Sequence, residues 1–461
     1  MKRTFMNSQR PLSCPAVDIR LISLRDSERG SILIITMWVV LVLTGLVLVF
    51  SRSMRVEAIA SANHISSLEA EEIARGAISF VKARLNEEDT ALKLEGETPY
   101  EAIPVSKGLF WLLRPNLEDD DTYYYGIRDE AANVNLNTAD YETLMNLPNM
   151  TSELAASIID WRDSDSELTD GGAESEYYLL LEEPYYCKDS ALESVEEVLL
   201  IKGASLEILF GEDTNRNGIL DPNENDGDES EPDDNRNGRL DRGFYDYVTV
   251  YSVEPNKNSE GEQRLDITSS EGKRELRSLL QRIITDTDRQ LYLSQMLNLS
   301  SFTSILDLYV KLELSEDEFR LIENEISASS EETIIGLINI NTAPKEVIKC
   351  IPGIEDADAE ILIKKRQSDG VDTDSIAWVY EALPDKASSI GEYITINSYQ
   401  YSADIISVSG DGRSFCRYRM VADTMEDTFD VIYWKALKQL GWPLYTEIIK
   451  ILRSGGSLEE I

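Results

Sequence analysis

The first hundred residues divide into an uncharged apolar stretch and an amphipathic one. Residues 31–51 carry no charged side chain and have the sequence SILIITMWVVLVLTGLVLVFS. As a helix, this stretch rises roughly 31 Å, which matches the hydrocarbon core of a bilayer. Residues 52–85 continue without proline, and their apolar side chains recur at helical spacing. The pattern predicts one long helix, whose first half spans a membrane and whose second half packs under a folded body.

The body carries strand patterns at both ends. Residues 99–129 alternate between apolar and polar positions, as half-buried strands do. Strand character returns after residue 392, and Gly410-Asp411-Gly412 predicts a hairpin turn there. We expect the early and late strands to form one antiparallel sheet that packs on the long helix. The late strands are predicted at residues 393–396, 401–406, 415–421 and 431–434.

Between the two strand regions, one motif occurs twice clearly and once in a degraded form. Residues 135–139 (NLNTA) are echoed by residues 339–343 (NINTA), and a weaker copy begins at residue 265. Each copy predicts a strand end, a capped short helix, a tight turn and a second helix, which is a helix-hairpin-helix pattern. The fold class is therefore α+β: a long N-terminal helix and an antiparallel sheet, with an inserted, mainly helical domain of helix-hairpin-helix (SAM-like) type.

Composition limits what these hairpins and the rest of the chain can do. The chain has 461 residues, which predicts two or three domains, and 85 acidic against 44 basic side chains give a formal net charge of -41. Because nucleic-acid affinity comes mainly from Lys and Arg that neutralise phosphates, this balance argues against a nucleic-acid partner. The single histidine, His64, argues against histidine-based zinc sites and Ser-His-Asp catalysis.

The strongest chemical motif is an acidic loop between the first two hairpins. Residues 213–224 (DTNRNGILDPNE) match the calcium-loop pattern D-x-[DN]-x-[DN]-G-x5-E at every position. Calcium takes about six to eight oxygen ligands around a tight turn, which Gly218 permits. The predicted ligands are the side chains of Asp213, Asn215, Asn217, Asp221 and Glu224 and the main-chain carbonyl of Ile219.

A second copy of this pattern begins twenty residues later and repeats its first nine positions. Phe244 stands at the twelfth position, so Asp226 or Asp228 would have to supply the last ligand. The alternative is that this stretch is an acidic linker that binds no metal. That explanation is the poorer one, because the stretch contains two in-register copies of Asn-Arg-Asn-Gly-x-Leu-Asp. Because no long helices flank the loops, calcium is expected to be structural and to fold residues 212–242. The predicted ligands of the second loop are Asp233, Asn235, Asn237 and Asp241.

Acidic side chains also gather between the first hairpin and the calcium loops, at Asp160, Asp163, Asp165 and Glu174. Paired carboxylates can serve as the acid and base of a hydrolase. No histidine, nucleophile elbow or lysine constellation accompanies these carboxylates. The preferred interpretation is that they cap and hydrogen-bond a long loop, and the chain is expected not to be an enzyme.

The N-terminal residues indicate how the chain is processed. Residues 1–30 carry six basic side chains against three acidic ones. Basic residues before a span and an acidic body after it predict a cytoplasmic N-terminus and an external body. Arg29-Gly30 stands directly before the apolar stretch, and the junction of Gly30 and Ser31 resembles the site that prepilin peptidase cuts in type IV pilins and type II secretion pseudopilins. The fifth residue after this junction is Ile35, where most members of those families carry glutamate.

An apolar fifth residue is typical of the K-type minor pseudopilins of type II secretion, the general secretion pathway protein K family. Asp160-Trp161-Arg162-Asp163-Ser164-Asp165, Gly172-Ala173-Glu174 and Tyr177-Tyr178 are similar to the signature of that family. The chain resembles it from Arg29 to about Val431. The resemblance implies a pilin-like fold with helical insertions and bound Ca²⁺.

The resemblance also implies the organisation of the chain. The expected parts are a prepilin leader at residues 1–30, a transmembrane half-helix at 31–51, an amphipathic half-helix and the first pilin strands at 52–130, an inserted helical domain at 131–385, and C-terminal pilin strands with a tail at 386–461.

The function that the resemblance implies is that of a minor pseudopilin at the tip of the type II secretion pseudopilus, which starts or caps assembly for export of folded proteins across the outer membrane. The mature chain would begin at an N-methylated Ser31 and cross the inner membrane once, with its body in the periplasm. Its partners would be the I- and J-type minor pseudopilins, prepilin peptidase and the inner-membrane assembly platform, with no nucleic acid.

Two other functions stay open at this point. One is a minor pilin of a type IV or DNA-uptake pilus whose hairpins bind DNA, for which Lys345 and Lys349 would be the phosphate contacts. The other is a membrane-anchored calcium-dependent hydrolase that uses Asp160 and its neighbouring carboxylates.

Overall fold

The computed structural model describes residues 27–86, 100–117, 119–227, 229–426 and 428–456. Helix α1 runs from Ser27 to Leu85, as the uninterrupted pattern predicts. By length and composition its apolar part is able to cross a membrane, with a mean hydropathy of 2.9. The chain divides into two compact units, with the boundary between Ile65 and Ser66 within α1. Most of the predicted leader, residues 1–26, lies outside the described residues.

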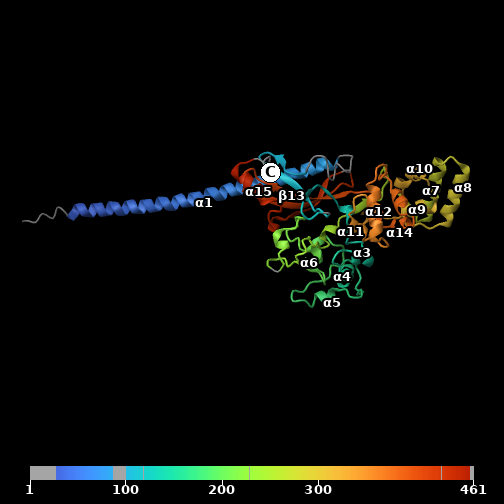
Figure 1. Cartoon of the computed structure of the whole chain (residues 1–461), viewed down its shortest axis with the longest axis horizontal. Helices are drawn as coiled ribbons and strands as arrows, with labels where there is room; N and C mark the ends of the chain where they lie inside the picture. The colour runs from blue at the N-terminus through green and yellow to red at the C-terminus, as the bar shows by residue number, and fades with distance from the viewer. Residues whose placement is uncertain (1–26, 87–99, 118, 228, 427, 457–461) are drawn as a thin grey trace, which may run out of the picture. The chain divides into compact units, whose positions relative to one another are not determined.

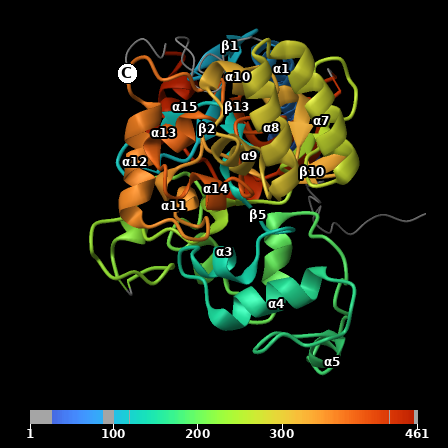
Figure 2. The same ribbon diagram turned by 90° about the vertical axis from the view of Figure 1, so that its right-hand side faces the viewer.

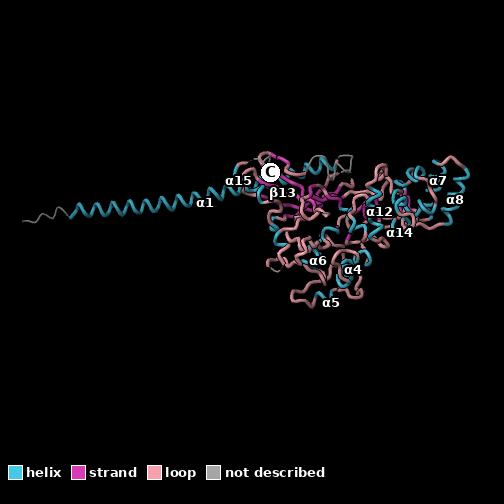
Figure 3. The backbone as a smooth tube through the Cα atoms, in the orientation of Figure 1, coloured by secondary structure: helices cyan, strands magenta, loops and turns pink. Residues whose placement is uncertain are grey.

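Early and late strands join in one antiparallel sheet, coloured magenta in Figure 3. The central order is β1-β2-β13-β14-β15, and β3 and β4 add to β2 and β13. Strand β2 lies beside β13 with Phe110 opposite Ser407, so segments almost 300 residues apart are neighbours. The predicted sheet is confirmed. Its strands are β1 (Ile103–Val105), β2 (Gly108–Arg114), β3 (Tyr124–Tyr125), β4 (Arg128–Asp129), β13 (Gln400–Val408), β14 (Phe415–Asp423) and β15 (Asp430–Ala436).

The second half of α1 packs on one face of this sheet. Buried Ile73, Ala77 and Val81 of the helix share a core with Phe110 and Met420 of the sheet. Burial of a large apolar side chain contributes about 1.5–3 kcal/mol, so this stripe holds helix and sheet together. The opposite face is covered by α15 (Thr446–Ser454), whose apolar side chains pack around Trp111 in β2.

Each of the three predicted motif copies folds as a strand, a helix, a turn and a second helix. The paired helices lie next to each other in Figure 2. The first copy is β5 (Val134–Asn135), α3 (Tyr141–Met145) and α4 (Ser152–Arg162); the second is β8 (Leu265–Asp266), α7 (Ser270–Ile283) and α8 (Thr287–Leu299); the third is β11 (Ile338–Asn339), α11 (Lys345–Ile348) and α12 (Asp356–Arg366).

Two contacts show how closely the first and third copies correspond. Arg162 at the end of α4 donates to the carbonyls of Leu136 and Ala139, and Arg366 at the end of α12 makes the two equivalent bonds. At the turn between the helices, Asn149 has a φ of +57° where the third copy has Gly353 at +80°. Asparagine tolerates this left-handed conformation better than most residues, so the missing glycine does not abolish the turn.

The strand predicted at residues 393–396 is placed differently. Ile394–Thr395 (β12) pairs in parallel with β11 and not with the antiparallel sheet, so that part of the prediction is wrong. The first and second copies are closed in the same way by β6 (Val248–Thr249) and β9 (Ile326–Ser327). Each copy is completed by a two-residue strand from later in the chain, and β12 performs this role for the third.

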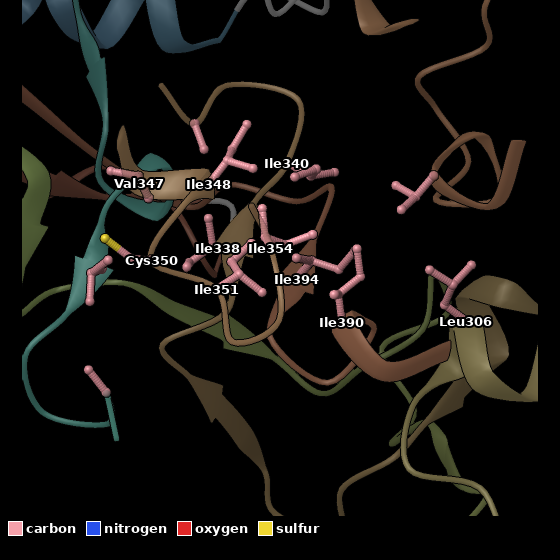
Figure 4. Packing of buried hydrophobic residues seen from close by; sticks show 14 of the residues in the cluster. Leu306, Ile338, Ile340, Val347, Ile348, Cys350, Ile351, Ile354, Ile390 and Ile394 are labelled. Atoms are coloured by element: carbon pink, nitrogen blue, oxygen red, sulfur yellow. The ribbon is translucent and has the colours of Figure 1, made fainter. Parts of the chain in front are cut away.

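The inserted region has one continuous core. Ile338, Val347, Ile351 and Ile394 of the third copy lie close together in Figure 4, with Leu306 of α9 nearby.

The short elements that complete the fold (Figure 1) are η1 (Glu130–Ala132), α5 (Ser175–Tyr178), η2 (Val195–Leu200), α6 (Leu206–Phe210), η3 (Pro222–Glu224), η4 (Tyr245–Tyr247), β7 (Val253–Pro255), α9 (Ile305–Lys311), α10 (Glu316–Arg320), η5 (Glu323–Glu325), β10 (Thr333–Ile335), α13 (Trp378–Ala382), α14 (Ala387–Ile390) and η6 (Lys438–Leu440). A long N-terminal helix packed on an antiparallel sheet, with an extra helical region, agrees with the predicted α+β class.

Candidate metal centre

The first calcium motif forms a loop between α6 and η3. Asp213 occupies its first position and is 5% exposed. Its carboxylate oxygens accept hydrogen bonds from the main-chain N–H groups of Asn217 at 3.0 Å and Gly218 at 2.9 Å. Gly218 has a φ of +76°, a conformation that glycine adopts without strain. The chain therefore turns tightly around the carboxylate of Asp213.

The other predicted side-chain ligands meet at Asp221. The amides of Asn215 and Asn217 donate to its Oδ2 at 2.6 and 3.0 Å. Glu224 is 1% exposed, and its carboxylate accepts from the main-chain N–H of Asp221 at 3.1 Å. Ile219, the predicted carbonyl ligand, lies in the same turn, where its N–H donates to Asn217 Oδ1 at 2.8 Å. Hydrogen bonds thus link the predicted side-chain ligands within one turn, where Asp213 accepts from main-chain N–H groups and Asp221 accepts from the two asparagine amides.

The electrostatics of this loop suit a divalent cation. Burial, followed by repulsion from Asp246, raises the pKa of Asp213 to about 6. Burial, followed by repulsion from Asp213, raises the pKa of Glu224 to about 8. Two buried carboxylates that repel each other are costly as anions unless a positive charge lies between them. Hard oxygen donors with excess negative charge fit Ca²⁺, which would neutralise these carboxylates and cross-link the loop.

The second loop has the same local hydrogen-bond pattern. Asn235 and Asn237 both donate to Asp241 Oδ2, at 2.5 and 3.2 Å. The N–H groups of Asn237 and Arg239 donate to the preceding asparagine side chains as in the first loop. Gly238 has a φ of +72°, close to that of Gly218. The shared sequence therefore produces the same turn twice.

The two loops differ at both ends of the motif. Asp233, Asn235, Asn237 and Asp241 are exposed. The N–H of Gly238 donates to Asn225 Oδ1 at 3.2 Å, whereas its counterpart in the first loop donates to the first-position aspartate. Phe244 is fully buried, and Asp226 accepts from the N–H and hydroxyl of Ser230. Asp228, the other candidate for the last ligand, lies outside the described residues.

A separate acidic cluster forms around Glu174, at the start of α5. Oxygens of Asp163, Asp165 and Glu174 lie within 4.8 Å of one another, and ligand atoms of Glu174, Cys187 and Asp189 do so as well. Such a set of oxygen and sulfur atoms could hold a metal ion. Burial, followed by repulsion from Asp160, raises the pKa of Glu174.

The interpretation of these acidic residues as loop caps holds only in part. Asp160 Oδ1 accepts from the N–H of Thr169 at 3.1 Å, but Glu174 makes no side-chain bond to the helix it begins. Among the described residues, one oxygen each of Asp160, Asp163 and Glu174 is buried without a hydrogen-bond partner. A Cβ on Gly172 would lie 2.0 Å from Asp160 Oδ2, so the glycine of the signature makes room for this carboxylate.

The sequence did not identify Cys187 and Asp189 as members of this cluster, because they come from a loop that no regular spacing links to α4. The only local signal is the short run Cys187-Lys188-Asp189, and it has no metal-ligand spacing by itself. The buried, unpartnered oxygens identify the cluster only once the chain is folded.

The predicted processing site lies at the start of α1. Gly30 and Ser31 are within the helix, and Ile35 follows one turn later with 58% of its surface exposed. Its surroundings in the helix are as apolar as the sequence predicts, with Ile34 and Trp38 exposed in the same way. Cleavage and the role of position 35 stay predictions.

The hairpin lysines that a DNA-binding function would need form ion pairs with carboxylates. Lys345 Nζ donates to Asp356 at 2.9 Å and to Glu360 at 3.0 Å. Lys349 lies 3.2 Å from the same Asp356. Their charges are directed to carboxylates of the neighbouring helix, which does not favour contact with phosphates.

Comparisons with known proteins found one family model and one solved structure that are similar to this chain. Residues 126–209 match the family model described as Type II secretion system (T2SS), protein K. Among solved structures, a chain of "The Crystal Structure of the GspK-GspI-GspJ complex from enterotoxigenic Escherichia coli Type 2 Secretion System" is similar with a TM-score of 0.40 and 12% sequence identity, over 83% of this chain and 99% of that chain. No curated protein matches.

The matched residues include the first hairpin, α5 and the acidic cluster around Glu174. These are the parts that carry the Asp-Trp-x-Asp-x-Asp and Gly-Ala-Glu signature. Over this segment the chain is therefore similar to the type II secretion system protein K family.

Proposed function

We propose that this protein acts at the tip of the type II secretion pseudopilus, where it starts or caps assembly of the fibre for export of folded proteins across the outer membrane. The observation that carries the proposal is the family match at residues 126–209 in a chain whose N-terminal helix has an uncharged stretch of membrane length. The family match argues against the hydrolase alternative, since a pseudopilin has a structural role.

The proposed location is the inner membrane, with one span, a cytoplasmic N-terminus and a periplasmic body. The basic excess of residues 1–30 and the acidic body support this orientation. Cleavage between Gly30 and Ser31, followed by N-methylation, would leave the apolar part of α1 in the mature protein. The domain limits at residues 30, 51, 130 and 385 are part of the same proposal.

The tip position is supported by Ile35. In most pilins a glutamate at this place is thought to neutralise the N-terminal amine of the neighbouring subunit during assembly. A chain with isoleucine there lacks this partner and suits a position where no further subunit is added above it. We propose the I- and J-type minor pseudopilins as its partners, because the similar solved complex contains GspI and GspJ together with GspK.

We propose Ca²⁺ as a structural ion of residues 213–224, held by Asp213, Asn215, Asn217, Ile219, Asp221 and Glu224. The support is the burial of Asp213 and Glu224 in a closed turn of oxygen donors. The cluster around Glu174 is a second candidate cation site. The second loop is the weaker candidate because its donors are exposed and its twelfth position is Phe244.

Mass spectrometry of the mature N-terminus from isolated inner membrane tests processing. A methylated peptide that starts at Ser31 is expected. A start near Asn63 would mean a soluble secreted protein, and an intact Met1 or Met6 would mean a plain membrane anchor; either result would contradict the pseudopilin function.

Immunolabelling of sheared pseudopili tests the tip position. The label is expected at one end of each fibre, with the I- and J-type subunits retained on a tagged copy of this chain. Label along the whole fibre would rule out a tip role.

A DNA-binding assay tests the alternative of a DNA-uptake pilus. Salt-dependent DNA binding that is lost in Lys345→Gln/Lys349→Gln would support that alternative.

A further inference from the structure

The first calcium loop is attached to the antiparallel sheet by a buried arginine. Arg417 lies on β14, and its side chain has no exposed surface. Its Nη1 donates to the main-chain carbonyl of Asn215 at 2.6 Å, and its Nη2 to that of Arg216 at 2.5 Å. These carbonyls belong to the third and fourth positions of the calcium motif, between Asp213 and Asn217.

Asp404 on the neighbouring strand β13 fixes the guanidinium from the other side. Its Oδ2 accepts from Arg417 Nη2 at 2.7 Å, and Nε lies 3.2 Å from both carboxylate oxygens. The guanidinium therefore has one edge held by a carboxylate of the sheet and the other held by two carbonyls of the loop. A planar group held at both edges has little freedom to rotate, and lysine cannot reproduce this arrangement.

Two more contacts also hold the first loop against its surroundings. Asn217 Nδ2 donates to the carbonyl of Pro443, just before α15, at 3.2 Å. Arg242 donates to the carbonyl of Gly218 at 3.0 Å and to Asp120 at 2.9 Å. The carbonyls of Asn215, Arg216 and Gly218 and the side chain of Asn217 are thus fixed from outside the loop.

These contacts bear on cation binding because the backbone of the loop decides where its oxygens stand. Calcium binds most tightly to donors that are already in position, and groups that orient the ligands typically change metal affinity by about 10- to 100-fold. We propose that Arg417 is a positioning residue for the first loop, which couples calcium binding to the docking of this loop on the sheet. The inference rests on the proposed calcium site.

Coupling of this kind is reciprocal. If an intact Arg417 anchor favours calcium binding, bound calcium favours the anchored loop by the same factor. A loaded loop would therefore hold the inserted helical region more firmly on β13 and β14, and a loop without calcium would hold it less firmly. Calcium would act on the packing between the two regions of the body as well as on the loop itself.

Calcium titration calorimetry on the full-length protein in detergent tests the proposal. Arg417→Lys is expected to lower the affinity of the Glu224-dependent site by about 10-fold or more. The matched control is Arg264→Lys, because Arg264 also forms a buried ion pair, with Glu254 at 2.7 Å, but does not contact the loop. This control is expected to leave calcium affinity unchanged even if it lowers the melting temperature.

Asp404→Asn keeps the test informative if Arg417→Lys does not fold. It frees the guanidinium without altering the loop, and an affinity loss smaller than that of Arg417→Lys is expected. Wild-type affinity in both folded variants would overturn the positioning role while the calcium site stands. If the Glu224→Gln variant binds calcium with the same affinity as the wild-type protein, the proposed calcium site itself fails. The failure of the calcium site is therefore distinguishable from the failure of the positioning role.

Discussion

The two calcium motifs of this chain share a local sequence but not an environment. Both place glycine at a φ above +70° and both gather two asparagine amides on one aspartate. In the first loop the aspartate of position one and the glutamate of position twelve are buried, whereas the second loop is exposed and has Phe244 at position twelve. The comparison teaches that the short motif specifies the turn, and that the surrounding fold decides which carboxylates are buried.

The difference follows from what each loop packs against. The first is held by Arg417, Arg242 and the carbonyl of Pro443, which keep its backbone away from water. The second loop contains Arg236, whose side chain is 55% exposed and contacts Glu229 at the surface. An exposed carboxylate is well solvated without metal, so it gains less from calcium than a buried one does.

The largest expected effect comes from removal of the closing carboxylate. Glu224→Gln takes one negative charge and one possible bidentate ligand from the first loop, and we expect calcium affinity to fall by about 100-fold. Glu229→Gln, an exposed position beside the second loop, is the control and is expected to change affinity less than twofold. Titration calorimetry measures both. Equal losses in the two variants would show that the loops do not differ as described.

Trypsin offers a direct comparison of the two loops, because each carries arginine at its fourth position. Arg216 is 18% exposed and pairs with Glu196 at 3.0 Å, while Arg236 is exposed. Calcium at ten times its Kd should slow cleavage after Arg216 by about tenfold, since cleavage requires the loop to open. Cleavage after Arg236 should be fast with calcium or with chelator. Mass spectrometry of timed digests would contradict the comparison if both sites were protected equally.

The sequence was sufficient for the elements whose pattern is local. The long helix, the hairpin copies and the outer strands follow from periodicity and turn residues over 10 to 20 positions. Ile394–Thr395 was assigned to the wrong sheet because a two-residue strand has the same pattern in a parallel ladder as in an antiparallel one. Its partner is decided by tertiary packing against β11, which no local pattern encodes.

The candidate sites divide in the same way. The hydrogen-bonded turn of the first loop was predictable because the residues that form it follow one another in the chain. The cluster around Glu174 was not, since Asp163, Glu174 and Cys187 come from three segments that only the fold brings together. The anchor from Arg417 was equally out of reach, because it contacts a loop about 200 residues earlier.

A smaller effect is expected from pH, and it sharpens the role of burial. Burial raises the pKa of Glu224 to about 8, and calcium can bind only after the proton leaves. The fraction of ionised Glu224 rises about fivefold between pH 7 and pH 8, so calcium affinity should rise by about the same factor. Calorimetry at both pH values, in buffers of different ionisation enthalpy, would show the released proton. An affinity that is constant over this range would mean that Glu224 is already ionised and does not lie in a repulsive, buried site.

The smallest expected effect tests whether the two loops need glycine equally at the turn that they share. Alanine at a positive φ costs about 1–2 kcal/mol, and Gly218 and Gly238 have nearly the same φ. A Cβ on Gly218 would also lie 3.1 Å from the backbone of Pro115, whereas a Cβ on Gly238 meets no atom within 4 Å. Because the second loop is exposed and can relax, Gly238→Ala should lower the free energy of unfolding by less than about 0.5 kcal/mol, and Gly218→Ala by about 1–2 kcal/mol. Denaturant unfolding in the presence of calcium measures both. Equal losses would mean that the second loop is held as firmly as the first, and that its exposure does not make it the weaker site.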